Sequence, residues 1–205
     1  MAKTRLTKNE LKSKKEELKR FNRYLPMLML KKRQLQAEIL KVQQAIQNLS
    51  VEIGQLRNLV VNWVDVFAQD INISDLVSLK RINIDEGNVA GLDLPVYRNI
   101  EIEEKPYDVL FTPFWVDEGV KSLKKTIELK AQLLVFHRQL EVLKEELRIT
   151  TQRVNLFEKI KIPQAKEAIR VIQIFLGELR TAEVVRGKIA KAKIQRKKEA
   201  VTLSS

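Results

Sequence analysis

The fold is decided by residues 18–63, which read LKRFNRYLPMLMLKKRQLQAEILKVQQAIQNLSVEIGQLRNLVVNW. Apolar side chains recur every seventh residue in two series, one starting at Leu18 and the other at Phe21. Fourteen of the fifteen positions in the two series are apolar, and Lys32 is the exception. A heptad repeat sustained for this long predicts a coiled-coil helix over about residues 5–68, with one narrow apolar seam and a solvated back.

A second heptad pattern occupies the C-terminal part of the chain, from about residue 117 to 198. Its seam includes Thr150 as a polar member and slips by one residue between Phe157 and Ala165. Pro163 lies inside this slip, so a bend is predicted there. Two long arms joined by a short insert must lie antiparallel, which predicts that both termini meet at one end.

The segment between the arms has a different pattern. Residues 77–84 and 96–103 alternate between apolar and polar side chains, and residues 85–88, which read DEGN, are predicted to form the turn between two strands. Residues 70–118 hold eleven Asp and Glu against four Lys and Arg, a net charge of −7. The insert is therefore predicted to be a small acidic β-hairpin element.

The predicted fold class is mostly α. A long antiparallel two-helix coiled coil is formed by the N- and C-terminal arms, with a small insert that contains a β-hairpin between them. We predict three segments: an N-terminal coiled-coil helix (1–69), the acidic insert (70–116) and a C-terminal coiled-coil helix with a basic tail (117–205).

Positive charge is concentrated at the two ends of the chain, which carries +12 overall. Residues 1–33 carry a net charge of +9 and residues 180–198 a net charge of +7. Two such segments repel each other, so an acidic surface, nucleic acid or an anionic membrane is expected around them. Near the first of them, Pro26 is followed by Met27, Leu28, Met29 and Leu30, an apolar collar that covers all sides of the helix and calls for a partner.

The sequence excludes several kinds of catalytic and metal site. It contains no cysteine and one histidine, which rules out disulfides, thiolate zinc sites and multi-histidine metal sites. No phosphate-binding loop is present, since the Gly187-Lys188 pair is followed by Ile189. We predict that the chain is not an enzyme and has no catalytic, metal-binding or cofactor-binding residue. No run of about 18 uncharged apolar residues occurs, so no direct membrane insertion is expected.

Three residues invite a functional interpretation, and a structural one is favoured for each. His137 lies off the apolar seam, which favours a solvated position over a catalytic one. Trp63 and Trp115 fall at the two junctions between the arms and the insert, where packing is favoured over ligand stacking.

Three stretches of the chain resemble the D subunit of the V-type and A-type rotary ATPases. The first is residues 6–11 (LTKNEL) with residues 30–35 (LKKRQL), and the second is residues 88–97 (NVAGLDLPVY). The third is residues 153–163 (RVNLFEKIKIP), continued by residues 169–179. The residues that carry the motif are Gly91, Pro95, Arg153, Asn155, Glu158 and Pro163.

The resemblance implies a mechanical function. In this family the chain is the central-stalk rotor shaft, which couples ATP hydrolysis or synthesis in a hexamer of catalytic A and B subunits to ion transport across the membrane. The implied partners are the A and B subunits, the small F subunit of the stalk and a membrane-side rotor connector, and the implied location is cytoplasmic and peripheral to the membrane. A prokaryotic source is expected because the chain lacks the longer tail of eukaryotic relatives. Candidate hexamer contacts are Met27, Leu30, Lys31, Arg33, Arg186, Lys188 and Lys191.

A basic coiled-coil protein that binds nucleic acid, or a scaffold protein, is the alternative. A sequence pI near 9.8 fits a nucleic-acid binder. In this chain, however, the apolar seam already runs through the basic stretch at Leu18 and Leu25, and an acidic insert and a second arm follow. A zipper-type DNA-binding dimer needs neither of these features, so direct nucleic-acid binding is not expected.

Overall fold

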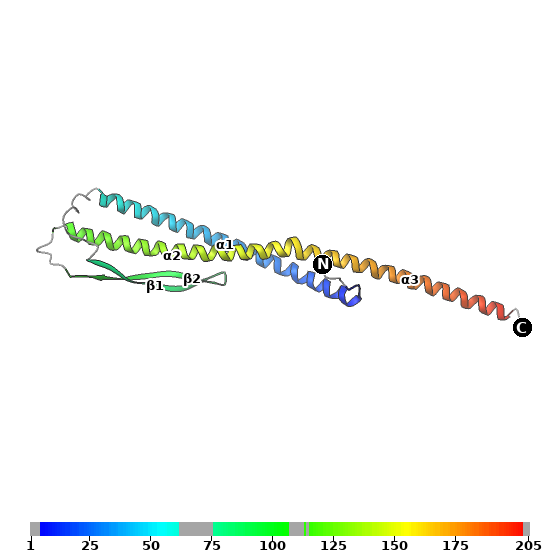
Figure 1. Cartoon of the computed structure of the whole chain (residues 1–205). Helices are drawn as coiled ribbons and strands as arrows, with labels where there is room; N and C mark the ends of the chain where they lie inside the picture. The colour runs from blue at the N-terminus through cyan, green and yellow to red at the C-terminus, as the bar shows by residue number, and fades with distance from the viewer. Residues whose placement is uncertain (1–4, 62–75, 107–112, 114, 203–205) are drawn as a thin grey trace. The chain divides into compact units, whose positions relative to one another are not determined.

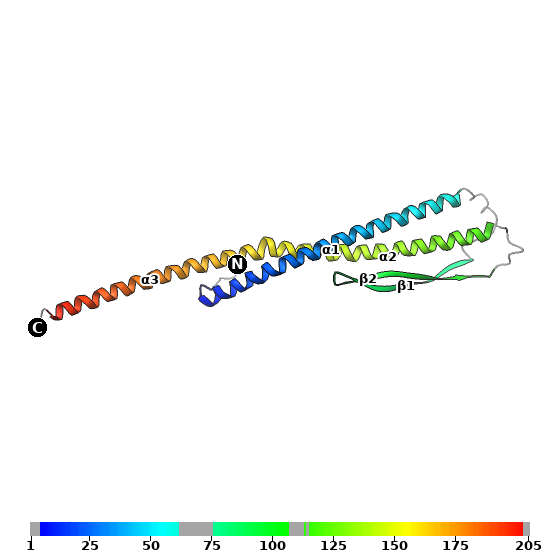
Figure 2. The same cartoon turned by 180° about the vertical axis from the view of Figure 1, so that it is seen from behind.

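A computed structural model of the chain describes residues 5–61, 76–106, 113 and 115–202 (Figures 1 and 2). Within this part, long helices precede and follow one two-stranded antiparallel hairpin, which confirms the predicted fold class. In chain order the elements are α1 (Lys8–Val61), β1 (Val77–Val89), β2 (Leu92–Glu104), α2 (Trp115–Asn155), the π-helical segment η3 (Leu156–Lys161) and α3 (Ile162–Thr202).

The chain divides into two compact units. The hairpin unit comprises Leu30–Thr151, and the end unit comprises Met1–Met29 together with Gln152–Ser205. Helices α1 and α2 each contribute residues to both units.

The seam predicted for α1 forms the core of the hairpin unit. Leu35, Ile39 and Val42 are buried and cluster with Leu143 of α2. Heptad spacing brings these α1 side chains to one face, so successive turns contribute apolar contacts. Burial of each large apolar side chain stabilises the unit by about 1.5–3 kcal/mol. Thr150, a polar member of the predicted α2 seam, is also buried.

Two ion pairs define the relative direction of α1 and α2 within the hairpin unit. The Lys31 amino group lies 2.7 Å from the Glu146 carboxylate, and that of Lys125 lies 4.0 Å from Glu52. Residue numbers rise along α1 while those of the partners fall along α2, which is the geometry of an antiparallel pair. The charged groups are partly exposed, so each pair stabilises the unit by no more than about 1 kcal/mol.

The hairpin has its turn at a different position from the one predicted. β1 and β2 are each 13 residues long, and residues 85–88 pair with β2 rather than forming the turn. The prediction of a turn at 85–88 is therefore wrong. Gly87 lies so close to β2 that an added Cβ would sit 2.7 Å from Val96 Cγ2. The glycine in this DEGN stretch permits close approach of the two strands instead of a chain reversal.

The chain reverses at Ala90 and Gly91, which have φ angles of 54° and 75°. A two-residue connection with positive φ at both positions matches the right-handed twist of the flanking strands. Asn88 holds this turn in place: its Oδ1 accepts a hydrogen bond from the Gly91 N–H (3.2 Å), and its Nδ2 donates one to Asp93 Oδ1 (2.7 Å).

Two alanine substitutions should move stability in opposite directions. Gly91→Ala places a Cβ on a left-handed residue and should destabilise the chain by about 1 kcal/mol. Gly177→Ala, in the exposed part of α3 where an added Cβ meets nothing within 4 Å, should stabilise it by about 0.5–1 kcal/mol. Urea unfolding followed by circular dichroism measures both shifts. A shift of the same sign for both variants would contradict the assigned turn.

The hairpin packs on the helices of its own unit, and Figure 1 shows it lying along α2. Near its tip, Leu94 is buried in the same cluster as the α1 seam. At its base, Val77 forms a second buried cluster with Val116. Between the two, Gln139 Nε2 donates a hydrogen bond to the Pro95 carbonyl oxygen at 2.5 Å. The insert is therefore fixed to the helix pair at several levels.

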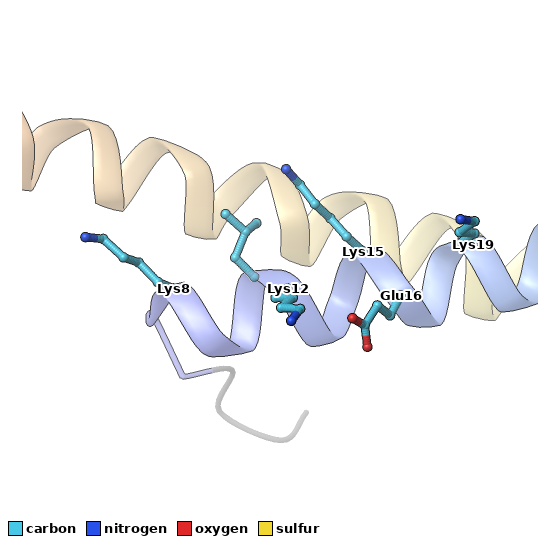
Figure 3. A pocket seen from close by; sticks show the side chains of 6 residues that line it. Lys8, Lys12, Lys15, Glu16 and Lys19 are labelled. Carbon is cyan, nitrogen blue, oxygen red and sulfur yellow. The ribbon is translucent and has the colours of Figure 1, made fainter.

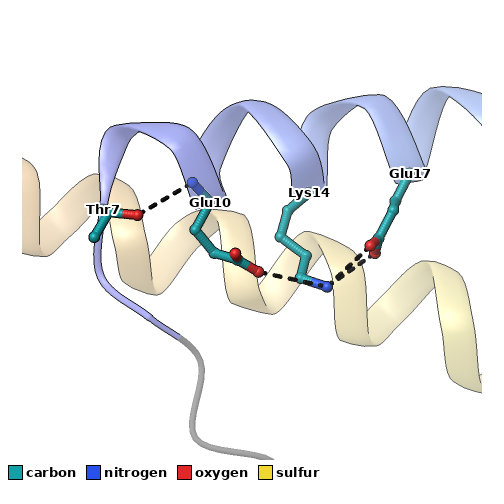
Figure 4. A network of polar contacts seen from close by, with 4 residues as sticks. All are labelled: Thr7, Glu10, Lys14 and Glu17. Carbon is teal, nitrogen blue, oxygen red and sulfur yellow. Dashed lines mark hydrogen bonds and ion pairs between the residues drawn. The ribbon is translucent and has the colours of Figure 1, made fainter.

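In the end unit, the first part of α1 packs on the π-helical segment η3. The rings of Phe21 and Phe157 are 5.4 Å apart and tilted by 58°, a geometry that aromatic pairs favour. Phe157 is half-buried, and Ala165 and Ile172 form the buried side of α3. Helix α1 begins with a cap, since the Glu10 N–H donates to Thr7 Oγ1 at 3.2 Å (Figure 4).

The predicted register slip is a π-helical segment. The Ile162 N–H donates to the Phe157 carbonyl oxygen five residues earlier, where an α-helix would use the fourth. One extra residue in the turn accounts for the eight-residue spacing from Phe157 to Ala165 in place of seven. Pro163 follows directly and has no N–H to continue the α-helical pattern. The bend predicted at Pro163 stays a prediction.

The basic end of the chain differs from its prediction. Residues 177–196 are all exposed except Ala182, which is half-buried. Figure 1 shows this part of α3 extending past the start of α1 within the end unit. The prediction that the two basic ends meet is wrong for the described residues, because the buried side of α3 ends near Leu176. Repulsion between the two basic segments also opposes their side-by-side packing.

Candidate partner-binding surfaces

Three of the four residues in the apolar collar that follows Pro26 are exposed to solvent, and Leu28 is half-buried. Met27 is 61% exposed, Leu30 58% and Met29 38%, and Tyr24 one turn earlier is 50% exposed. Scattered single apolar residues are common on protein surfaces, but several adjacent ones typically mark a contact with a partner. The collar is therefore the first candidate surface.

The two cations that follow the collar differ in their surroundings. Lys31 is half-buried and pairs with Glu146 at 2.7 Å, so its charge is already neutralised within the chain. Arg33 is exposed, and it forms no ion pair with the residues that the structure describes. Of the two, Arg33 is the better placed to contact a partner.

The other candidate cations lie on the exposed end of α3. Arg186, Lys188 and Lys191 are all exposed. They lie roughly 40 Å or more along the helix from Phe157, which contacts Phe21. Within the end unit, the structure therefore does not bring them to the collar residue Met27.

The family-motif residues fall into two groups. In the hairpin, Gly91 forms the turn and Pro95 accepts the hydrogen bond from Gln139. The others are exposed around η3, where Leu156 and Ile160 are also 40% and 45% exposed. Exposed apolar side chains at these two positions are not among the predictions from the sequence. Their location beside the register slip is the feature of the sequence that indicates such exposure. The exposed motif residues are Arg153, Asn155, Glu158 and Pro163.

A row of lysines on α1 was also missed. Together with Leu11 and Glu16 it lines an open pocket of about 370 Å³ (Figure 3). The spacing of i, i+4, i+7 and i+11 is visible in the sequence, whereas the net charge of the segment does not show that these lysines share one face. The row consists of Lys8, Lys12, Lys15 and Lys19.

The described residues offer little for acid–base or metal chemistry. They contain no group of three or more His, Asp and Glu side chains that could hold a metal ion. His137 is exposed, as the sequence indicated. Trp115 packs against the cluster at the base of the hairpin, which confirms its structural interpretation, while Trp63 lies outside the described residues. None of the described helices has the length and apolar character needed to cross a membrane.

Shifted pKa values occur at surface ion pairs and at one tyrosine. Hydrogen bonds from Arg148 lower the pKa of the Glu145 carboxyl, and hydrogen bonds from Arg170 do the same for Glu167. Burial raises the pKa of the Tyr97 phenol. Each carboxylate partner lies three residues before its arginine on one helix, so these pairs support the helices and form no reactive site.

Comparison with known proteins identifies the family. Residues 10–192 match the model of the family described as the D subunit of ATP synthase. The V-type ATP synthase D subunit of Borreliella burgdorferi is 44% identical over 197 residues, covering 96% of this chain and 98% of that protein. Proteins of the same name in Chlamydia abortus and Chlamydia caviae are 33% and 34% identical, each covering 95% of both chains. The chain therefore belongs to the family of ATP synthase D subunits.

Proposed function

We propose that the helices of this chain act as a rotor shaft, which couples ATP hydrolysis or synthesis in a catalytic hexamer to ion transport across the membrane. Membership of the family of D subunits makes the chain a central-stalk component of a V-type ATP synthase. The observation that carries the proposal is this membership, matched over residues 10–192, together with the long helices of α1, α2 and α3.

The shaft acts mechanically and contributes no catalytic residue. Its partners are the A and B subunits of the hexamer, which carry the ATP-binding interfaces. A shaft without three-fold symmetry presents a different face to each interface, and it biases each one through different contacts. The π-helical segment, the single hairpin and the exposed end of α3 support such asymmetry, since each occurs once in the described part of the chain.

The three segments divide the contacts between them. The arms 1–69 and 117–205 contact the hexamer through the collar residues Met27 and Leu30 and through the exposed cations. Arg33, Arg186, Lys188 and Lys191 meet acidic surface, while Lys31 positions the collar through Glu146. The insert 70–116 contacts the small F subunit of the stalk and the membrane-side rotor connector. The chain is cytoplasmic and peripheral to the membrane as part of this complex.

Reconstitution tests the proposal. The purified chain is mixed with the A, B and F subunits of the same organism, treated with nuclease and separated by size. We expect one copy of this chain to elute with the hexamer and the F subunit. Failure to co-elute, or capture that disappears with nuclease, would favour the nucleic-acid alternative, which no observation on the described surfaces supports. In that case duplex affinity would fall log-linearly with salt.

A further inference from the structure

The lysine row of α1, defined as Lys8, Lys12, Lys15 and Lys19, carries the inference. At 100° per residue, this spacing places all four Cβ atoms on one face of the helix, over about 16 Å of its length. All four residues are exposed and line the same open pocket. The first turns of the helix thus present a continuous line of positive charge.

No negative charge on the described part of the chain neutralises this line. Among the described residues, none of the four lysines forms an ion pair, and Figure 3 shows the Glu16 carboxylate pointing away from the Lys15 amino group. The neighbouring Lys14 shows the contrast: its amino group lies 2.9 Å from Glu17 and 3.8 Å from Glu10 (Figure 4). Two of the three carboxylates in this segment, those of Glu10 and Glu17, pair with Lys14, and that of Glu16 lies beside the row without forming an ion pair with it.

Helix physics disfavours the row in the isolated chain. The N-terminal end of a helix carries a partial positive charge, so lysines in its first turns are unfavourable. Like charges at i, i+3 and i, i+4 repel one another as well. An external anionic surface along the row would remove both penalties, so charge complementarity indicates an acidic partner.

The chemistry of the row indicates an acidic protein surface rather than nucleic acid. The residues that line the pocket include no aromatic side chain on which a base could stack and no arginine that could bind a phosphate or carboxylate in bidentate fashion. Lysine amino groups are compact, strongly hydrated charges on flexible stems, which attract carboxylates without fixing one geometry.

We propose that the lysine row is a non-locking electrostatic contact with carboxylates on the inner surface of the hexamer. This inference rests on the proposed shaft function. It adds the lysine row as a contact site and explains why the row consists of lysines rather than arginines. Lysine pairs can break and re-form at successive angles as the shaft turns. Four arginines in place of this row would add bidentate pairs that resist breaking at each step of the rotation.

Two quadruple variants and one control separate charge from geometry. Lys→Gln at all four positions removes the charge, and Lys→Arg keeps the charge while allowing bidentate pairing. The control is Lys→Gln at four exposed lysines elsewhere, namely Lys80, Lys105, Lys130 and Lys144. Each chain is bound to preassembled hexamer across a NaCl series, and ATP turnover of the assembled complex is then measured. Circular dichroism checks the helicity of every variant.

We expect the Gln variant of the row to bind the hexamer at least about tenfold more weakly at low salt and with a smaller salt dependence than the control. The Arg variant should bind as tightly as the original chain or more tightly, with turnover reduced about twofold or more by the stronger pairs. Gln-variant affinity equal to that of the control would overturn the contact. Arg-variant turnover at the original rate would overturn its non-locking character.

Two further comparisons distinguish a failure of this inference from a failure of the proposed function. If the unmodified chain does not bind the hexamer, the shaft function fails and the lysine contact fails with it. If the unmodified chain binds and the Gln variant of the row binds equally well, only the lysine contact fails. A row variant that loses affinity for a fluorescent DNA duplex while binding hexamer normally would also overturn the contact, because the row would then serve a polyphosphate.

Discussion

Replacing both Met27 and Leu30 by aspartate should prevent the chain from assembling with the hexamer while leaving its helices folded. Both side chains are about 60% exposed, at 61% and 58%, so their removal costs the isolated chain little. In an apolar interface, the two substitutions remove the apolar contacts of Met27 and Leu30 with the hexamer. They also bury two unpaired carboxylates, which adds a desolvation penalty. A loss of about 2 kcal/mol or more per hot-spot residue corresponds to at least a thirtyfold weaker complex for each. Size-exclusion chromatography with A and B subunits measures assembly, and circular dichroism at 222 nm measures helicity.

A matched control distinguishes the collar from any exposed apolar position on the same helix. Leu40 of α1 is 60% exposed, so Leu40→Asp introduces one carboxylate at the same exposure as each of the two collar substitutions. We expect this variant to assemble like the original chain. Loss of helicity in Met27→Asp/Leu30→Asp would mean that the collar supports the fold, and equal loss of assembly for Leu40→Asp would mean that the collar is not special.

The helical part of the fold could be predicted because its signal is local and repeated. Heptad spacing places Leu35, Ile39 and Val42 in the core whatever the partner helix is, and the structure buries all three. The one-residue slip before Ala165 likewise required an irregular turn, although periodicity alone could not say that the extra residue enters as a π-helix.

The hairpin shows where local signals mislead. The stretch at 85–88 has the composition of a turn, and the real turn at Ala90 and Gly91 contains a residue that rarely takes positive φ. Strand pairing and the side chain of Asn88 outweigh this preference. Such a choice depends on cross-strand contacts that a single strand's pattern does not contain.

The candidate surfaces were predictable in kind but not in arrangement. Charge counts indicated basic ends, and the collar's composition indicated exposed apolar surface. Which charges are already neutralised depends on residues distant in sequence. Lys31 forms an ion pair with Glu146 of α2, whereas the lysine row forms no ion pair with the described residues. Sequence spacing within one helix cannot supply that information.

Leu143→Ala should give the largest loss of stability of any single substitution considered. Leu143 is fully buried and belongs to a cluster that joins α1, α2 and the hairpin, since the cluster also contains Leu35 and Leu94. Truncation of a fully buried leucine removes its transfer free energy and leaves a cavity between elements that cannot all close in. We expect the free energy of unfolding to fall by about 2–5 kcal/mol, as measured by urea denaturation.

Leu134→Ala is the control, because Leu134 lies on the same helix and is 61% exposed. It should change the free energy of unfolding by no more than about 0.5 kcal/mol. Hydrogen exchange adds a readout of where stability is lost: in Leu143→Ala, amides at the hairpin tip near Leu94 should exchange faster because their packing partner is gone. Equal destabilisation by the two variants, or unchanged exchange at the tip, would contradict a core in which the hairpin and both helices depend on one side chain.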